Sequence, residues 1–226
     1  MTTSVVLTAI AVVVFGYLVG SLSPSVFLGR LCGGKDVRCH GSGNAGTTNA
    51  FRVLGPRLGL VVLIADMLKG VVPVVLAREL STPLVTVFVA LACVLGHNYS
   101  IFLRGRGGKG VATGAGAAIG MMPVPMAILF AVYLALLFGT RVVSIASITC
   151  TILLPIIAVA FNQPLPYIVV FCLMSVLVLW AHRGNFVRLW RRREPRICFP
   201  WNAKKPSSEQ CDPLLGPVPT EDDTSQ

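Results

Sequence analysis

The sequence predicts an all-α, polytopic integral membrane protein with about seven transmembrane helices, and three observations lead to this fold class. First, hydrophobic residues make up 54% of the 226 residues and charged residues only 12%, which gives a mean hydropathy of +0.77. Second, apolar runs of about twenty residues recur along the chain, and a helix of that length crosses the hydrocarbon core of a bilayer. Third, most basic residues lie between these runs, as expected beside membrane spans.

The first three predicted spans cover Ser4 to about Gly29, Gly59 to Ala77, and Pro83 to about Leu103. The first has no basic segment before it and is long for a signal-peptide core, so we expect an uncleaved span. The second carries Asp66 and Lys69, which are three residues apart and share one helical face. Ionisable groups inside a span are costly unless they pair or face a polar cavity. Two roles are therefore open to them: a structural ion pair that orients helices, or a direct part in a functional site.

Charge decides how many spans follow the third. The run from Lys109 to Gly139 fits either one long helix or two short ones that meet at Pro123, and two further spans cover Val142 to Phe161 and Leu165 to Ala181. The polar segments share one side of the membrane only if an even number of spans separates Lys109 from the basic segment that follows Ala181. We therefore predict a break at Pro123 and seven spans, with the N-terminus outside and the C-terminus cytoplasmic. The span from Lys109 to Met122 is short, so we expect it to be tilted or partly buried in protein.

The distribution of basic residues supports this orientation. Of 19 Lys and Arg residues, only Arg78 then lies in an external loop and only Lys69 lies within a span. The formal net charge of +10 follows from this asymmetry. Nucleic acid is therefore not an expected partner, because no basic face interleaved with aromatic residues exists apart from the spans.

The chain divides into a membrane-embedded domain, residues 1–194, and a cytoplasmic tail, residues 195–226. From about Lys204 onward the sequence is polar, rich in proline and finally acidic. We expect this tail to be disordered, because it has little apolar surface to bury. The seven cysteines form no C-x-x-C pair, so we expect no metal site and no disulfide framework. No other cofactor is expected.

A polar stretch from His40 to Arg52 stands out from the apolar sequence around it. Glycines let the backbone curl so that successive N–H groups point into one concavity, which is how many proteins hold phosphate. Short polar side chains add hydrogen-bond donors, and Arg52 can donate two hydrogen bonds to an oxyanion. The residues with these properties are Gly41, Ser42, Gly43, Asn44, Thr47, Thr48, Asn49 and Arg52.

A second polar stretch runs from Gly96 to Thr113 and places Lys109 among glycines. It does not form a Walker A loop, because a glycine instead of Ser or Thr follows the lysine. A third group follows the last span. The three groups offer many donors and few carboxylates, so together they predict an anion pocket at the membrane boundary. The second and third groups comprise His97, Gly105, Gly107, Gly108, Lys109, Gly110, His182, Arg183 and Asn185.

Structural roles are open to several of these residues. His97 could cap the third span, and His182 could lie at the membrane interface beside Arg183. Ser147, which lies just inside a span, belongs to a residue type that commonly packs helices together.

The polar segments resemble the motifs of a known enzyme family. The segments are G-S-G-N-A-G-T-T-N-A-F-R-V-L-G, D-M-L-K-G, G-H-N-Y-S-I-F-L-R-G-R-G-G-K-G-V-A-T and H-R-G-N-F-V-R-L. In this order, over about residues 16–194, they are similar to the bacterial acyl-phosphate-dependent glycerol-3-phosphate acyltransferases, the PlsY family. The H-x-x-x-x-D dyad of acyl-CoA-dependent glycerolipid acyltransferases is absent from the sequence.

The resemblance implies a multi-pass enzyme of the bacterial inner membrane whose site faces the cytoplasm. Such an enzyme transfers an acyl group from acyl phosphate to the 1-hydroxyl of sn-glycerol 3-phosphate. The products are lysophosphatidate and phosphate, and the reaction opens phospholipid biosynthesis. The implied partners are acyl phosphate, glycerol 3-phosphate and membrane lipids. The leaving phosphate is expected to take the hydroxyl proton.

The resemblance also implies roles for individual residues. The residues expected in catalysis are Ser42, Arg52, Lys109, His182 and Asn185. The residues expected to bind substrate are Gly41, Gly43, Asn44, Thr48, Asn49, His97, Gly107, Gly108, Gly110 and Ser147.

The sequence departs from the family pattern at three places. Ala45 and Ser100 stand where prolines are usual, and the Gly-x-Glu close of the third motif becomes Arg192-Arg193-Glu194. Two other functions fit the composition. A transporter of phosphate or an organophosphate would place its polar groups near the bilayer midplane, and a lipid-binding scaffold would need no catalytic groups.

Overall fold

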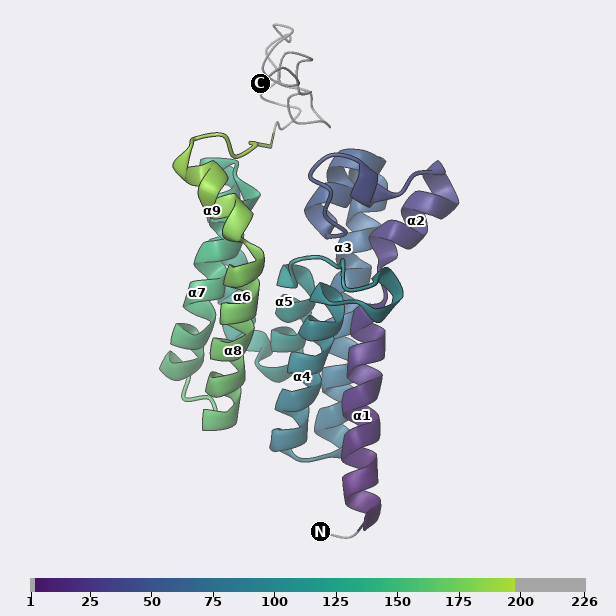
Figure 1. Cartoon of the computed structure of the whole chain (residues 1–226). Coiled ribbons are helices and arrows are strands. Elements are labelled where there is room, and N and C mark those ends of the chain that lie inside the picture. Colours follow the sequence, from purple (N-terminus) through teal and green to yellow (C-terminus); the bar gives the residue numbers. More distant parts are fainter. Residues whose placement is uncertain (1–2, 198–226) are drawn as a thin grey trace, which may run out of the picture.

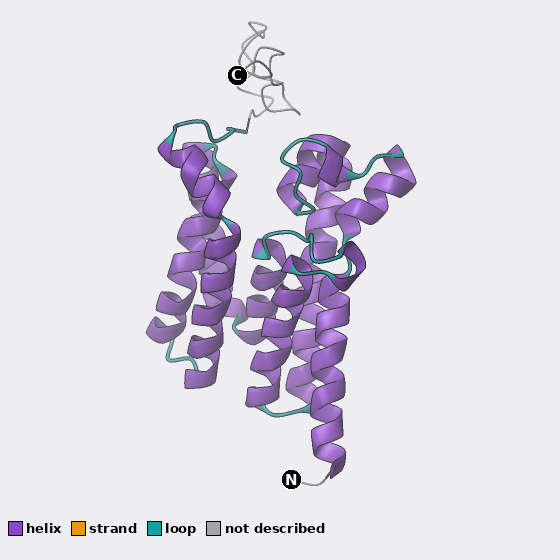
Figure 2. Ribbon diagram, in the orientation of Figure 1, coloured by secondary structure: helices purple, strands orange, loops and turns teal. Residues whose placement is uncertain are grey.

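The computed structural model describes residues 3–197, and every regular element within that range is a helix (Figure 2). The predicted all-α class is therefore confirmed. The α-helices are α1 Thr3–Ser21, α2 Pro24–Gly33, α3 Thr47–Leu80, α4 Pro83–Asn98, α5 Val111–Met121, α6 Pro123–Thr140, α7 Val143–Ala160, α8 Leu165–Ala181 and α9 Arg183–Trp190. Two short 3-10 helices, η1 Val37–Cys39 and η2 Ile101–Leu103, lie in the polar stretches.

The helices form two groups that lie side by side (Figure 1). One group contains α1, α3, α4 and α5, in which α3 packs mainly on α5 and α1 mainly on α4. The other contains α6, α7 and α8, with α9 above them in the view of Figure 1. Contacts between α4 and α8 join the groups, and one buried apolar core runs through both, with Val89 and Cys93 of α4 and Phe171 and Met174 of α8 among its members.

Glycines allow the closest helix contacts in the first group. A Cβ atom added at Gly20 of α1 would collide with the backbone of Cys93 on α4. On the other pair, a Cβ atom at Gly70 would collide with the backbone of α5 at Thr113. Small residues at such positions let backbones approach closely, which is how helices associate where no water drives them together.

Length and composition mark five candidate membrane spans in residues 3–197. They are Thr3–Gly33, Thr47–Leu80, Pro83–Leu103, Pro123–Thr140 and Val143–Ala160. The pair α8 and α9, bent by 56°, makes a sixth if it is counted as one span. Helix α5 has 11 residues, or about 16 Å of rise, and is largely buried among its neighbours. The predicted break at Pro123 is confirmed, whereas the total of seven crossings stays a prediction.

Two helix boundaries differ from the sequence-based expectation. The first span was expected to run unbroken to about Gly29, but α1 ends at Ser21 and α2 begins at Pro24, because proline lacks the N–H that would continue the helix. The second span was expected from Gly59, but α3 begins at Thr47 and kinks at Gly55, which has φ 82°. That conformation favours glycine, and the residue before a proline avoids the helical region.

The described chain starts and stops at opposite ends of the bundle, as an odd number of crossings requires (Figure 1). Which end faces the cytoplasm stays a prediction. So does the boundary of the tail at residue 195, and the expected disorder of residues 198–226 lies outside the described residues.

The close contact of α3 with α5 predicts that Gly70→Val destabilises the protein. The added side chain must displace backbone, so we expect a loss of about 1–3 kcal/mol or more in the free energy of unfolding. Thermal unfolding in detergent measures this. Gly139→Ala is the control, because a Cβ atom there meets nothing within 4 Å. Equal melting temperatures for Gly70→Val and Gly139→Ala would contradict the packing described above.

Candidate active site

The first polar loop, loop 1 (residues 40–46), is held in its curled shape by Asn49. The Asn49 side chain is 1% exposed. Its Oδ1 accepts a hydrogen bond from the backbone N–H of Ser42 at 2.8 Å, and its Nδ2 donates to the carbonyls of Val37 and Asn44 at 2.7 and 2.9 Å. Both ends of the Asn49 side-chain amide are therefore hydrogen-bonded to backbone groups of loop 1 and of the segment before it. Asn49 shapes the loop, and its expected contact with substrate stays a prediction.

Loop 1 carries two glycines in the left-handed region, Gly41 with φ 59° and Gly43 with φ 68°. The expected curl of the backbone therefore forms. Ser42 between them is exposed, Asn44 is half-buried, and Thr48 is half-buried in the first turn of α3. These side chains lie on or beside the loop, where a ligand could reach them.

The acid nearest to loop 1, Asp36, is occupied by arginines. Its carboxylate accepts hydrogen bonds from Arg38 Nε and Nη2 at 3.0 and 2.7 Å and from Arg30 Nη2 at 2.9 Å. The hydrogen bonds from Arg38 hold the pKa of Asp36 well below its ordinary value. Asp36 therefore stays ionised and paired, and its charge is largely neutralised.

The second polar loop, loop 2 (residues 99–110), folds back onto the end of α4. The N–H of Gly107 donates to the carbonyl of Asn98 at 3.2 Å, and the N–H of Gly108 donates to that of His97 at 3.0 Å. A Cβ atom on Gly107 would collide with the His97 carbonyl, and one on Gly108 with the His97 ring. These two glycines therefore let the loop pack closely on α4, whether or not they also contact a ligand.

Loops 1 and 2 meet at a cavity of about 380 Å³. A Cβ atom placed on Gly46 of loop 1 would lie 4.0 Å from the Cα of Gly108 in loop 2. The start of α9 closes a third side. The lining residues are Asn44, Asn98, Tyr99, Gly105, Arg106, Gly107, Gly108, Lys109, Trp180, Ala181, Arg183 and Gly184. The expected convergence of all three polar groups is thus present.

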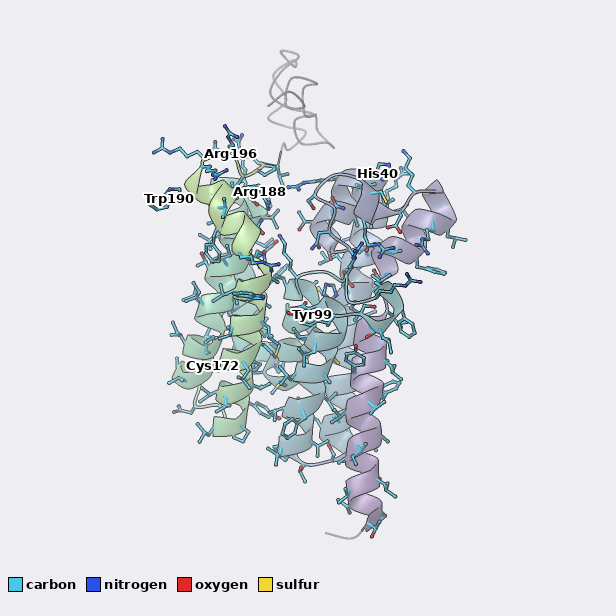
Figure 3. The ribbon with its side chains drawn as sticks, viewed as in Figure 1. His40, Tyr99, Cys172, Arg188, Trp190 and Arg196 are labelled. Carbon is cyan, nitrogen blue, oxygen red and sulfur yellow. The ribbon has the colours of Figure 1, made fainter. Side chains whose placement is uncertain are left out.

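Lys109 connects loop 2 to the third polar group. Its Nζ donates a hydrogen bond to Oδ1 of Asn185 on α9. Asn185 Nδ2 donates in turn to Glu194 Oε1 at 2.6 Å, and Glu194 Oε2 accepts from Arg188 Nε at 2.8 Å. Figure 3 shows Arg188 and Arg196 at the same end of the molecule as His40 of loop 1.

The electrostatics of this cluster favour a bound anion. Burial, together with the charges of Arg188 and Arg52, lowers the pKa of Lys109 to about 8, although Glu194 opposes this shift. Arg52 also interacts electrostatically with Glu194 and Arg188. Three basic side chains therefore share Glu194 as their acidic neighbour among the residues that the structure describes here. An anion in the cavity would relieve their mutual repulsion.

Glu194 and Arg188 were not among the residues that the sequence analysis selected. The Glu194 side chain is 7% exposed and fixes both Asn185 and Arg188. The sequence analysis noted it only as an altered end of the third motif. One signal was available: Glu194 is the only acid between His182 and Arg196, and a lone acid in a basic segment has cations to pair with.

The remaining predicted residues lie around the cluster in different ways. His182 is 3% exposed, its Nδ1 lies 2.8 Å from the carbonyl of Val178, and it feels the charge of Lys109. The His97 ring lies beneath loop 2, where its Nδ1 is 3.1 Å from Thr113 Oγ1. Ser147 of α7 is 3% exposed, and its expected contact with substrate stays a prediction. Gly110, which has φ 81°, is the N-cap of α5 and directly follows Lys109.

The sequence is similar to that of known proteins over most of its length. The sequence model of the family described as "Glycerol-3-phosphate acyltransferase" matches residues 10–192. A glycerol-3-phosphate acyltransferase of Syntrophomonas wolfei subsp. wolfei is 40% identical over 187 residues, which cover 83% of this chain and 96% of the relative. Another, of Bacillus cytotoxicus, is 42% identical over 186 residues, which cover 82% and 93%.

Solved structures share the fold. The crystal structure of PlsY, an integral membrane glycerol 3-phosphate acyltransferase, in its glycerol 3-phosphate form matches with a TM-score of 0.82 and 36% identity, over 84% of this chain and 96% of that chain. Its lysophosphatidic acid form matches with a TM-score of 0.78 and 35% identity, over the same shares. Because the family model and the relatives span most of the sequence, this chain belongs to the glycerol-3-phosphate acyltransferase family.

Proposed function

We propose that the protein transfers an acyl group from acyl phosphate to the 1-hydroxyl of sn-glycerol 3-phosphate, giving lysophosphatidate and phosphate. The observation that carries this proposal is the cavity where loops 1 and 2 and α9 meet, beside the cluster of Arg52, Lys109 and Arg188. Both substrates bear phosphate, and a basic, glycine-lined cavity suits two phosphate groups held close together. The relatives are named glycerol-3-phosphate acyltransferases, which supports glycerol 3-phosphate as the acceptor.

The chemistry needs positioning more than a strong base, because an acyl phosphate is already activated. The hydroxyl oxygen of the acceptor attacks the acyl carbonyl carbon, and the bond from that carbon to the phosphate oxygen breaks. The departing phosphate takes the hydroxyl proton, so no side chain has to act as base. Lys109 and Arg52, which are both half-buried, stabilise the negative charge that develops on the leaving phosphate, as expected of cations held in fixed positions.

The acyl chain and the acceptor require different surroundings, and the cavity offers both. Its polar side is formed by loops 1 and 2. Tyr99, which directly follows α4, and Trp180 of α8 also line it, and both side chains are exposed beside helices whose outer faces are apolar. Trp180 stacks against the guanidinium of Arg183 at 5.4 Å, an arrangement suited to the membrane interface. We propose that the fatty chain leaves the cavity past these aromatic residues into the bilayer.

We also propose that the protein resides in the bacterial inner membrane with the cavity facing the cytoplasm. Residues 30–57 around loop 1, loop 2 itself and the segment after α8 are rich in Lys and Arg, whereas the opposite end of α3 and its turn to α4 hold only Arg78 and Glu79 as charged residues. Cytoplasmic segments carry the excess of basic residues in membrane proteins. The membrane domain would then end near residue 194 and the tail would lie in the cytoplasm.

The proposal predicts that purified protein makes lysophosphatidate and phosphate from acyl phosphate and glycerol 3-phosphate, and that acyl-CoA does not replace acyl phosphate. Lys109→Ala and Arg52→Ala should each lower kcat/KM by at least about 100-fold, since each removes a half-buried cation from the proposed phosphate site. Arg57→Ala is the matched control, because Arg57 lies on the same helix as Arg52 and is exposed to solvent. Turnover in Lys109→Ala equal to that in Arg57→Ala would exclude the proposed role of the cations.

The depressed pKa of Lys109 predicts how binding depends on pH. The lysine attracts phosphate only while protonated, so affinity for glycerol 3-phosphate should fall as pH rises above about 8, by up to about tenfold per pH unit. The ligand is a dianion throughout this range, since its second pKa is about 6. Calorimetry without acyl donor measures the affinity between pH 7.5 and 9.5. In Lys109→Arg the decline should disappear, because guanidinium stays protonated; an unchanged decline would assign the effect to another group.

The orientation predicts which engineered cysteines a membrane-impermeant maleimide reaches in intact cells. In a background without native cysteines, Glu79→Cys should react from outside, whereas Arg104→Cys of loop 2 should react only after the membrane is permeabilised. Both positions are exposed. The opposite pattern would reverse the proposed topology.

A further inference from the structure

A buried polar cluster lies directly beneath loops 1 and 2 and takes no part in the reaction proposed above. Its centre is the pair Asp66 and Lys69 of α3, which are 1% and 6% exposed. Asp66 Oδ1 lies 2.9 Å from Lys69 Nζ. Thr47, His97 and Thr113 surround the pair, so four separate parts of the chain contribute to the cluster or are bound by it.

Asp66 fastens the end of loop 1. Its Oδ2 accepts a hydrogen bond from Thr47 Oγ1 at 3.0 Å, and Thr47 is the residue that directly follows loop 1. The kink at Gly55 separates Thr47 from the long part of α3 that carries Asp66. The hydrogen bond therefore spans the kink and holds the first turns of α3, with loop 1 attached, against the rest of the helix.

Lys69 holds the short segment between α1 and α2, to which loop 2 is also hydrogen-bonded. Its Nζ donates to the carbonyl of Leu22 at 2.6 Å, and Leu22 lies outside both α1 and α2. The neighbouring carbonyl, that of Ser21, accepts a hydrogen bond from Ser100 Oγ of loop 2 at 2.6 Å. The ammonium group thus fixes the position of the segment on which the start of loop 2 rests.

His97 connects the same pair to the glycines of loop 2. Its Nδ1 lies 3.7 Å from Asp66 Oδ1 and 3.1 Å from Thr113 Oγ1. Its carbonyl accepts from the N–H of Gly108, and Gly108 packs on the ring so closely that no Cβ atom would fit. A shift of His97 would therefore shift Gly108 and the adjacent Lys109.

We propose that Asp66 and Lys69 are positioning residues that set the spacing of loops 1 and 2, and hence the distance between the two phosphate sites. An ordinary packing pair would only hold α3 to its neighbours. This pair instead bonds to the residue that follows loop 1 and to the chain break on which loop 2 rests. Such support is needed where residues behind a site keep it in its productive geometry. Its effect on turnover rests on the proposed function, whereas its effect on the loops does not.

The principal test is the double variant Asp66→Val/Lys69→Met. Removing both charges avoids leaving one buried and unpaired, so the protein should stay folded. We expect kcat to fall at least tenfold with a smaller change in KM for glycerol 3-phosphate. Hydrogen exchange measured by mass spectrometry should rise in peptides that cover residues 41–50 and 104–110 and stay unchanged in α6, α7 and α8.

Arg78→Met is the matched control. Like Lys69, Arg78 is a basic residue of α3 that donates to a backbone carbonyl outside its own helix, that of Gly120 on α5 at 2.6 Å. Arg78 lies near the C-terminal end of α3, whereas loop 1 precedes the N-terminal end. Its loss should change neither kcat nor exchange in the loops. The proposal is overturned if the double variant is folded with kcat within twofold of the wild type. It is also overturned if exchange rises equally throughout the protein or is unchanged in the loops.

A milder pair of variants decides the question if the double variant does not fold. Thr47→Val removes only the bond from Asp66 to loop 1, and Thr47→Ser keeps it. We expect faster exchange in residues 41–50 and a several-fold lower kcat for Thr47→Val, with both restored in Thr47→Ser; identical behaviour of the two would refute the proposal. If the wild type makes no lysophosphatidate from any donor, the proposed function fails, and the exchange measurements still decide the positioning role.

Discussion

The hydrogen bond from Lys109 to Asn185 joins the two helix groups at the end of the molecule where the polar loops meet. Lys109 follows the glycines that hold loop 2 against α4, and Asn185 lies on α9 beyond the last long helix. The remaining contacts between the groups shown by the structure are chiefly apolar ones of α4 with α8. Apolar packing fixes the distance between helices but tolerates sliding, whereas a charge-assisted hydrogen bond fixes a direction. The geometry of the cavity therefore depends on this bond more than on the core beneath it.

Donors at the site divide into those used by the protein and those left for a ligand. The amide of Asn49 is consumed by the backbone of loop 1, and the N–H groups of Gly107 and Gly108 are consumed by α4. Lys109 and Arg52 keep donors that the described contacts do not use up. Building the loops from saturated groups makes them rigid, and this rigidity holds the free cations in place before an anion arrives. Preorganised charge of this kind needs no rearrangement during a reaction.

Much of this arrangement could be predicted from the sequence, because it is encoded by residues that are close together along the chain. Apolar runs gave the helical class, glycine-rich stretches gave the loops, and the counting of charge gave the break at Pro123. The kink at Gly55 was missed, since a Gly-Pro pair also fits a loop between two elements. The role of Glu194 was missed for a different reason. Its partners Asn185 and Arg188 are nine and six residues away, and only the turn after α9 brings the carboxylate back to them, which no pattern of spacing reveals.

The roles of Asp66 and Lys69 could not be decided from the sequence, whereas their contacts in the structure decide them. Their spacing predicted a pair on one helical face, but it left a packing role and a site role equally open. The contacts show that the two roles are compatible: the pair is buried among helices, yet it bonds to Thr47, which follows loop 1, and to Leu22, which lies in the break on which loop 2 rests. In a membrane domain, water is not available to satisfy backbone groups at a chain break. A buried cation that donates to the Leu22 carbonyl therefore helps to stabilise the break between α1 and α2, which Pro24 introduces and on which loop 2 rests.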